Sequence, residues 1–225
     1  MIVKAVFRVC VYSFNVLFFT LTSCTSVTID EYRKGNSHLT ENDAVVVLGR
    51  RHSSDYETEP ELIECIAEIL ADGDRGINVI KEQEFLDNLY PWFEPRTAPM
   101  NMRRLERMIQ EDQIGQKLQD YNISFIVWID GNTETTESSG TIGCSISAAG
   151  GGCFGMGTWE KESNYEASIW DYKERKVLGK INADASGTSY MPAIVIPIPI
   201  IARVQANACK GIAKQLLDFF TPSTD

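Results

Sequence analysis

The first 23 residues constrain what this chain can fold into more than any other feature, because they are typical of an export signal. Lys4 and Arg8 give a short basic start with no acidic residue before Asp30, and an apolar run follows from 9 to 21. Basic residues, an apolar run and then small residues are the order of a secretory signal peptide. The run is shorter than the roughly 20 residues that a helix needs to cross hydrocarbon. Residues 1–23 are therefore predicted to be removed, so that the remainder folds outside the cytoplasm.

The last three residues of this segment and the cysteine that follows them, Leu21-Thr22-Ser23-Cys24, resemble the lipobox of bacterial lipoproteins. The resemblance implies cleavage before Cys24 and acylation of that residue, which holds the chain on a membrane by a lipid anchor. Thr25 and Ser26 follow without an Asp, and enterobacterial sorting rules then imply the outer membrane, facing the periplasm. Ordinary cleavage elsewhere and an uncleaved anchor helix are the alternatives. The predicted organisation is a signal peptide (1–23), a lipidated polar tether (24–42) and one globular periplasmic domain (43–225).

The charge of the mature chain limits its partners. The full sequence carries 21 Lys and Arg against 31 Asp and Glu, and the signal removes two basic residues, which leaves 19 against 31, a net charge of −12. Such an acidic surface argues against nucleic acid and against anionic lipid headgroups as partners. The membrane is therefore expected to be reached by acylation and not by a basic patch.

Four cysteines remain after Cys10 in the signal and Cys24 at the anchor are set aside. An even number in an oxidising compartment predicts disulfides, with three possible connectivities. Cys65 lies on the apolar side of segment 60–71, and Cys209 faces inward because apolar residues follow it at helical spacings. Cys144 and Cys153 flank a short Gly-rich segment. We therefore favour Cys65–Cys209 and Cys144–Cys153. Buried free thiols and a redox-active pair are the alternatives, although no CxxC motif is present.

Hydrophobic periodicity and turn residues predict the secondary structure. Strands are expected at 43–50, 77–80, 123–130, within 142–159, at 165–172 and at 177–186. Helices are expected at 60–71, 81–89, 101–121 and 200–220, with a polar turn region at 131–140. The order is β-α-β-α-β, then antiparallel hairpins and a C-terminal helix. This predicts an α/β (α+β) domain, a single mixed sheet with helices packed on it.

Two stretches in this order, ISFIVWIDG at 123–131 and ASIWDYKERKVLGKI at 167–181, are similar to a group of envelope lipoprotein domains. The group includes the periplasmic domain of the curli-secretion channel, the lipoprotein activators of penicillin-binding proteins and the N-terminal domain of the periplasmic Tol protein. The resemblance implies the same topology over about residues 43–220. It implies no function, because folds host many functions.

Catalytic and metal-binding patterns are weak. His38 and His52 have no partner at metal-ligand spacing, and there is no GxSxG nucleophile motif. The Gly-rich segment Ala148–Gly157 ends without the Lys that a phosphate loop requires, so it is interpreted as a tight hairpin closed by a disulfide. No metal and no cofactor are expected, and the chain is predicted not to be an enzyme.

Two apolar segments are unusual for loops. Trp92 and Phe93 lie between Pro91 and Pro95, and Met191–Ile201 includes Ile196 and Ile198 among its prolines. Apolar loops either pack against a core or contact something else. For 191–201, shallow contact with the outer membrane is a third reading.

The sequence is interpreted as a non-enzymatic lipoprotein that binds envelope proteins or assembles in a cell-envelope complex. Its partner-binding candidates are Trp92, Phe93, Ile196 and Ile198. The alternative is a periplasmic small-ligand-binding protein or hydrolase, with a pocket under the Gly-rich hairpin. The sequence identifies neither the partner nor the oligomeric state.

Overall fold

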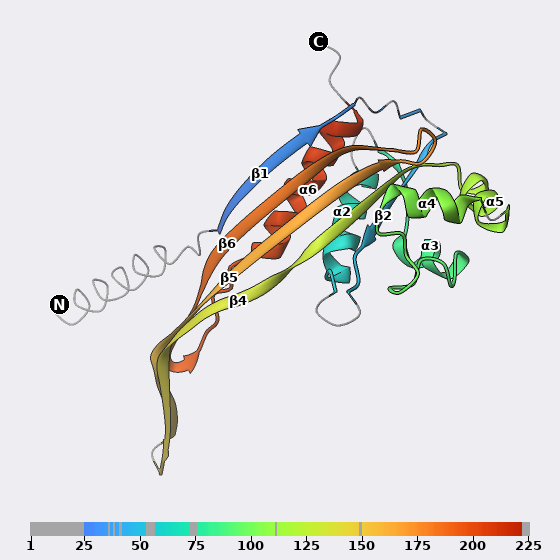
Figure 1. Cartoon of the computed structure of the whole chain (residues 1–225). Coiled ribbons are helices and arrows are strands. Elements are labelled where there is room, and N and C mark those ends of the chain that lie inside the picture. The colour runs from blue at the N-terminus through green and yellow to red at the C-terminus, as the bar shows by residue number, and fades with distance from the viewer. Residues whose placement is uncertain are drawn as a thin grey trace.

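The computed structural model describes residues 25–35, 37, 39–40, 42–52, 57–72, 76–110, 112–148 and 150–221. The predicted signal peptide, Cys24 and His38 lie outside these residues. Within them, the chain forms a six-stranded mixed sheet with five helices packed on it, which confirms the predicted fold class (Figure 1). The strands lie in the order β1-β6-β5-β4-β2-β3. Their bounds are β1 (Thr25–Arg33), β2 (Ala44–Gly49), β3 (Asn78–Ile80), β4 (Ile123–Ser147), β5 (Gly150–Asp171) and β6 (Lys176–Pro197).

The sheet has a parallel and an antiparallel half. β2 pairs in parallel with β3 on one side and with the first residues of β4 on the other. All six residues of β2 are buried, which fits its continuous apolar sequence, because a parallel strand is covered on both faces. β4, β5, β6 and β1 are antiparallel neighbours. The hairpin turn that joins β5 to β6 lies where the sequence predicted it.

The helices divide between the two faces. α2 (Pro60–Asp72) and α6 (Val204–Phe220) cover one face, where their apolar residues pack on Val45, Val127 and Ile169. α3 (Glu82–Asn88), α4 (Met102–Ile109) and α5 (Asp112–Asp120) cover the other face over β2 and β4, where they enclose Ile126 and Trp128. Alternate residues of each strand therefore enter two different cores. No described helix is long and apolar enough to cross a membrane.

The predicted tether is wrong for residues 25–33, which form the edge strand β1. Thr25 pairs with Gly187 and Arg33 with Gly179, so the whole segment lies along β6. Apolar residues occupy two alternate positions of β1, Val27 and Ile29, which face α6. A Cβ built at Gly211 on α6 would lie 2.7 Å from Ile29 Cδ1. The polar residues Ser26, Thr28 and Asp30 alternate with them and face away from α6, because successive side chains of a strand point to opposite faces. Glu31 shares the face of Val27 and Ile29 and accepts a hydrogen bond from Gln215 on α6.

Two further boundaries differ from the prediction. The expected helix at 101–121 is two helices, and α5 approaches the end of α4 so closely that a Cβ at Gly115 would lie 3.0 Å from the Ile109 carbonyl oxygen. The expected turn region at 131–140 is strand. Gly131 has φ of 133° and pairs with Tyr165, and a Cβ there would lie 1.9 Å from the Asn164 carbonyl oxygen. This glycine permits close strand pairing and does not mark a turn.

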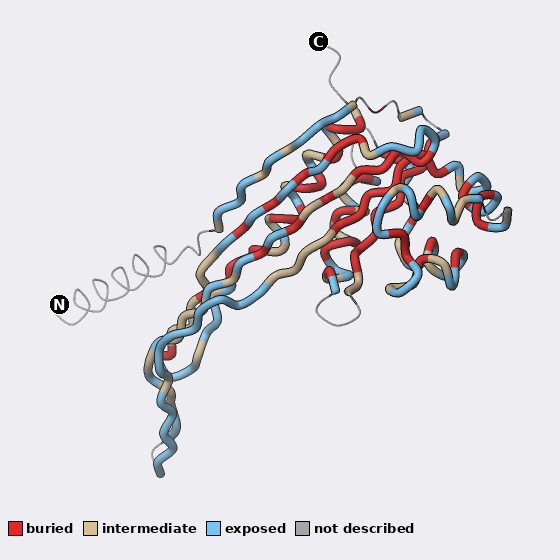
Figure 2. The backbone as a smooth tube through the Cα atoms, viewed as in Figure 1, coloured by how far each residue is buried: buried red, intermediate tan, exposed pale blue. Residues whose placement is uncertain are grey.

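β4 and β5 continue far beyond the helices as a narrow, twisted ribbon (Figure 1). Their pairing runs without a break in the ladder from Phe125↔Asp171 to Ser147↔Gly150, apart from a register shift near Thr135. The last part of β6 pairs with this ribbon as far as Cys153↔Val195. We call residues 138–159 and 187–201 the arm. Figure 2 shows that burial is concentrated in the body of the sheet and falls off along the ribbon toward its tip.

Candidate functional site

The arm is uncharged, unlike the rest of this acidic chain. No Asp, Glu, Lys or Arg occurs from Ser138 to Trp159 or from Ala185 to Ala202. Charged residues begin again at Glu137 and Glu160, where the ribbon meets the body of the sheet. A solvated surface of an ordinary domain carries interspersed charges. The arm therefore has the composition of a surface that contacts something other than water.

One face of the arm exposes large apolar side chains. Phe154 lies directly opposite Ile194, and Met156 lies opposite Pro192. Directly paired residues in an antiparallel ladder project from the same face, so these four side chains form one patch. Phe154 is 78% exposed and Ile194 is 67% exposed. Single exposed apolar residues are normal, but a contiguous group is typical of an interaction site.

The opposite face of the arm carries the disulfide and, close to the turn at the tip, an exposed isoleucine. Cys144 and Cys153 are directly paired, with Cα atoms 4.0 Å apart, and their bridge fixes the register of the ribbon. Ile146, close to the turn, is 92% exposed. Gly155 has φ of 146°, and a Cβ there would lie 2.1 Å from the Thr141 carbonyl oxygen. Only glycine fits this position, so the Gly-rich sequence serves close pairing of backbones.

After β6, the chain folds back along the arm. Ile198 donates its backbone N–H to the Pro192 carbonyl at 3.0 Å, and Tyr190 and Ile200 exchange two backbone hydrogen bonds. Val195 has φ of 79°, which is unfavourable for a β-branched residue. The predicted candidates Ile196 and Ile198 are 67% and 51% exposed. This apolar segment is therefore held in place by the backbone while its side chains face solvent.

The other predicted candidates lie in a different environment. Phe93 is 4% exposed, its ring centroid is 4.7 Å from that of Phe85, and it stacks near Trp128 at 6.3 Å. The prediction that Phe93 binds a partner is wrong, because the ring fills the core between α3 and the sheet. Trp92 is half-buried against the same core, with the Lys117 ammonium 5.9 Å from the ring centroid.

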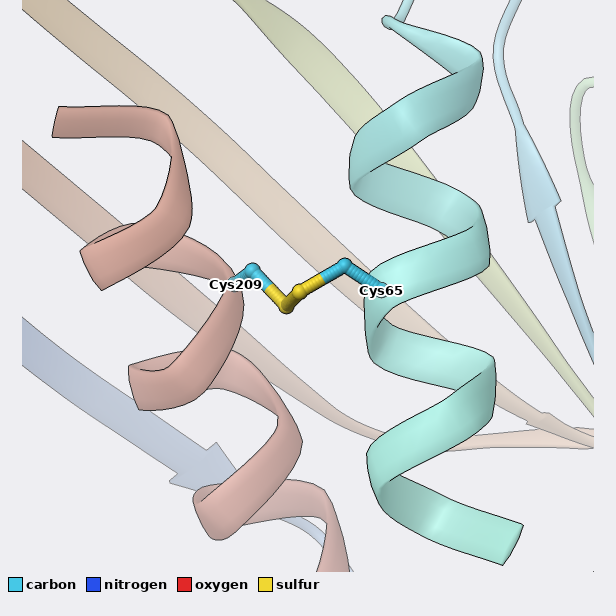
Figure 3. The surroundings of a disulfide bond; sticks show 2 residues. All are labelled: Cys65 and Cys209. Carbon is cyan, nitrogen blue, oxygen red and sulfur yellow. A yellow bond between two sulfur atoms is a disulfide. The ribbon is translucent and has the colours of Figure 1, made fainter. Parts of the chain in front are cut away.

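The two disulfides have the connectivity favoured from the sequence. Cys65 on α2 is bonded to Cys209 on α6, with Cα atoms 6.3 Å apart (Figure 3). This bridge joins the two helices that cover one face of the sheet, at a sequence separation of 144. The second bridge, Cys144–Cys153, lies in the arm. One disulfide therefore stabilises the body and the other the arm.

Charged residues gather where β2 and the parallel part of β4 end, which is a common site position in α/β sheets. The Arg50 guanidinium lies 3.7 Å from the centroid of the Trp128 ring and donates to the Pro99 carbonyl at 2.8 Å. Burial lowers the pKa of Arg50 to about 10, and the charge of Asp130 opposes this shift. Arg50 therefore stays protonated at neutral pH and links β2 to the segment before α4.

A second charged group lies nearby. His52 Nε2 is 3.1 Å from Asp130 Oδ1. The Glu82 carboxylate accepts the Gly49 N–H at 2.7 Å, and burial raises the pKa of Glu82 despite this hydrogen bond and the nearby Arg51. Among the described residues, no group of three or more His, Cys, Asp or Glu side chains could hold a metal ion.

A groove of about 500 Å³ lies beside this group, between α2, β3 and α3. Its charged lining consists of Arg51, Glu64, Glu68, Asp72, Lys81 and Glu82, and its lining includes no Ser, Thr, Cys or His. It is not under the Gly-rich hairpin, where the ligand-binding alternative placed a pocket. The arm and not this groove is therefore the candidate functional site.

Comparisons with known proteins give only distant structural similarity. No protein-family model and no curated protein matches the sequence. Two PelC dodecamer structures from Paraburkholderia phytofirmans, the first of them a point variant, are similar with TM-scores of 0.39 and 0.38, at 12% and 14% identity. Each similarity covers 88% of this chain and 100% of the other. A neuraminyllactose-binding hemagglutinin homolog from Helicobacter pylori is similar with a TM-score of 0.37 at 11% identity, over 84% of this chain and 91% of that chain.

Proposed function

We propose that this protein is a lipid-anchored, periplasm-facing protein of the outer membrane that binds other envelope proteins through its arm and is not an enzyme. The observation that carries the proposal is the uncharged arm with its exposed apolar patch. Phe154, Met156 and Ile194 form that patch on one face. Aromatic residues and Met are enriched in protein interfaces, and charged residues are depleted at interface cores.

The arm is ordered before any partner arrives, which favours binding. Three paired strands and the Cys144–Cys153 bridge fix its backbone. Binding costs conformational entropy for every segment that must be ordered, and a preordered surface avoids most of that cost. The patch is therefore a rigid binding surface and not an adaptable loop.

Two features support the proposed cellular location. Cys24, in the lipobox-like sequence, directly precedes Thr25, the first residue of β1. Two disulfides within one small domain are typical of proteins that fold in an oxidising compartment. Intact mass of the membrane-extracted protein tests the anchor: a chain that begins at Cys24 with added acyl mass supports it, and an unmodified N-terminus elsewhere contradicts it.

The arm is tested by replacing Phe154 and Met156 together with Ser. We expect recovery of crosslinked envelope proteins from intact cells to fall strongly while Tm stays nearly unchanged, because both side chains are exposed and lie outside the two cores. The matched control is Glu162→Ser, which is exposed on the same strand and the same face but lies outside the arm. Equal recovery from the double variant and the control would contradict the binding function of the patch.

A further inference from the structure

We infer that the fold-back segment of the arm, residues 195–201, lies in the headgroup layer of the bilayer that holds the lipid anchor. This inference rests on the proposed acylation of Cys24. It assigns a lipid surface to one part of the arm and leaves the patch around Phe154 to a protein partner. The two surfaces are different in composition, because the fold-back segment is entirely aliphatic and proline-containing.

The proposed anchor and the sheet are joined without an intervening linker. Thr25 follows Cys24 directly and is already paired with Gly187. One extended residue spans only about 3.6 Å. The acylated end of the chain is therefore fixed to the start of β1, and the bilayer surface must lie close to that point.

The end of the fold-back segment lies beside the start of β1. A Cβ built at Gly187 would lie 3.1 Å from Thr25 Oγ1 and 2.9 Å from Ala202 Cβ. Thr25 and Ala202 therefore meet on one face of β6, although they are far apart in sequence. The residue before Ala202 is Ile201, whose side chain is exposed. The end of the fold-back segment thus lies next to the expected point of attachment.

The rest of the fold-back segment lies within a short distance of the start of β1. Pro192 is five residues along β6 from Gly187, and a strand rises about 3.3 Å per residue, so Pro192 lies roughly 17 Å away. Ile198 is hydrogen-bonded to Pro192. The exposed side chains of Val195, Ile196 and Ile198 therefore extend along the sheet from a point near the anchor.

The side chains of the fold-back segment suit a lipid surface. Aliphatic side chains enter the boundary between headgroups and acyl chains, whereas basic residues remain at the level of the phosphates. The uncharged stretch ends at Arg203, which is exposed. The acidic surface of the domain opposes contact with anionic lipid elsewhere, and this segment contains no acidic residue. An aliphatic loop followed by a cation suits a predominantly zwitterionic leaflet.

The test measures where the segment lies in a membrane. The acylated full chain with Ile198→Cys is spin-labelled and placed in vesicles of phosphatidylethanolamine with a minor fraction of phosphatidylglycerol. Cys24 carries the lipid in the acylated protein, and Cys65, Cys209, Cys144 and Cys153 are bridged, so none of these cysteines reacts with the label. The matched control is Asn182→Cys, an exposed position on β6 that lies outside the arm. We expect the label at 198 to lose several-fold in collisions with a water-soluble nickel chelate and to gain in collisions with oxygen, relative to the label at 182.

Each other outcome overturns the inference in a distinguishable way. Equal nickel access at both positions, in protein that floats with the vesicles, would remove the bilayer contact and leave the anchor standing. Dipolar broadening between labels at 198 would show that a second copy covers the segment instead. Protein that carries no acyl mass and does not float would overturn the anchor, and the bilayer contact with it.

Discussion

Trp92 and Phe93 are adjacent residues with different surroundings. The Phe93 ring is enclosed by Phe85 and Trp128, whereas the Trp92 ring is half-buried and lies near the Lys117 ammonium. The prolines around them hold the backbone, so the two side chains are directed to fixed and separate positions. Their neighbours come from other elements, which is why local sequence left open whether these rings pack in a core or bind a partner.

We expect Phe93→Ala to lower the free energy of unfolding by about 3–5 kcal/mol, because it removes a large ring from a close-packed core. Trp92→Ala is the matched comparison and should cost about 1 kcal/mol, which is typical of an average substitution. Denaturant unfolding of both variants measures the difference. Similar losses for the two variants would contradict the separation that the structure shows.

At the scale of elements, the sequence predicted the buried parts well and the exposed parts poorly. β2 has a continuous apolar sequence because both of its faces enter a core. β5, α2 and α6 have apolar periodicity, because one face of each enters a core. β1 has only two apolar residues on the face that meets α6, Val27 and Ile29, and the outer part of β4 lacks apolar periodicity. Residues 131–140 are polar on both faces and become strand only because β5 lies beside them. A strand that forms only because a neighbouring strand pairs with it has no local sequence pattern from which it could be predicted.

The disulfides should differ in what they stabilise. We expect removal of the arm bridge by Cys144→Ser with Cys153→Ser to raise amide exchange in the arm and to leave the body's protection nearly unchanged. None of the described arm residues belongs to either core. Local opening is governed by local contacts. Amide hydrogen exchange of the oxidised protein, resolved by peptide, is the measurement.

The matched variant, Cys65→Ser with Cys209→Ser, should instead lower global stability. The bridge closes a loop with a sequence separation of 144, for which chain entropy gives a stabilisation on the order of 5 kcal/mol. Loss of protection throughout the body is therefore expected. Unfolding of the body by removal of the arm bridge alone would show that arm and body form one cooperative unit.

At the scale of the whole molecule, both parts of the proposed membrane surface could be identified from the sequence, but their closeness in space could not. The lipobox-like sequence and the apolar segment 191–201 are visible in the chain as written. Only the pairing of Thr25 with Gly187 brings them together. Edge pairing between the first and last strands depends on the complete sheet, so no local signal could predict it.

A flexible insert between Cys24 and Thr25 tests whether this proximity directs the domain onto the membrane. About six Gly and Ser residues add a mean reach of roughly 13 Å. We expect the label at position 198 to become accessible to the nickel chelate, while acylation, disulfides and Tm stay unchanged. A label that remains shielded despite the insert would show that the short connection does not position the segment.

The Cys144–Cys153 bridge lies within the loop that Cys65–Cys209 closes. The order in which the cysteines emerge during export therefore affects which bridges form first. Cys65 comes first, Cys144 second, Cys153 nine residues later, and Cys209 last. Oxidation in order of emergence would join Cys65 to Cys144, and thiol–disulfide exchange would then have to undo that bridge. The native pairs form directly only if Cys144 stays reduced until Cys153 has followed it. A pause in translocation between these two residues would therefore trap the chain with the wrong partner, whereas rapid passage of the arm leaves Cys65 free for the final helix.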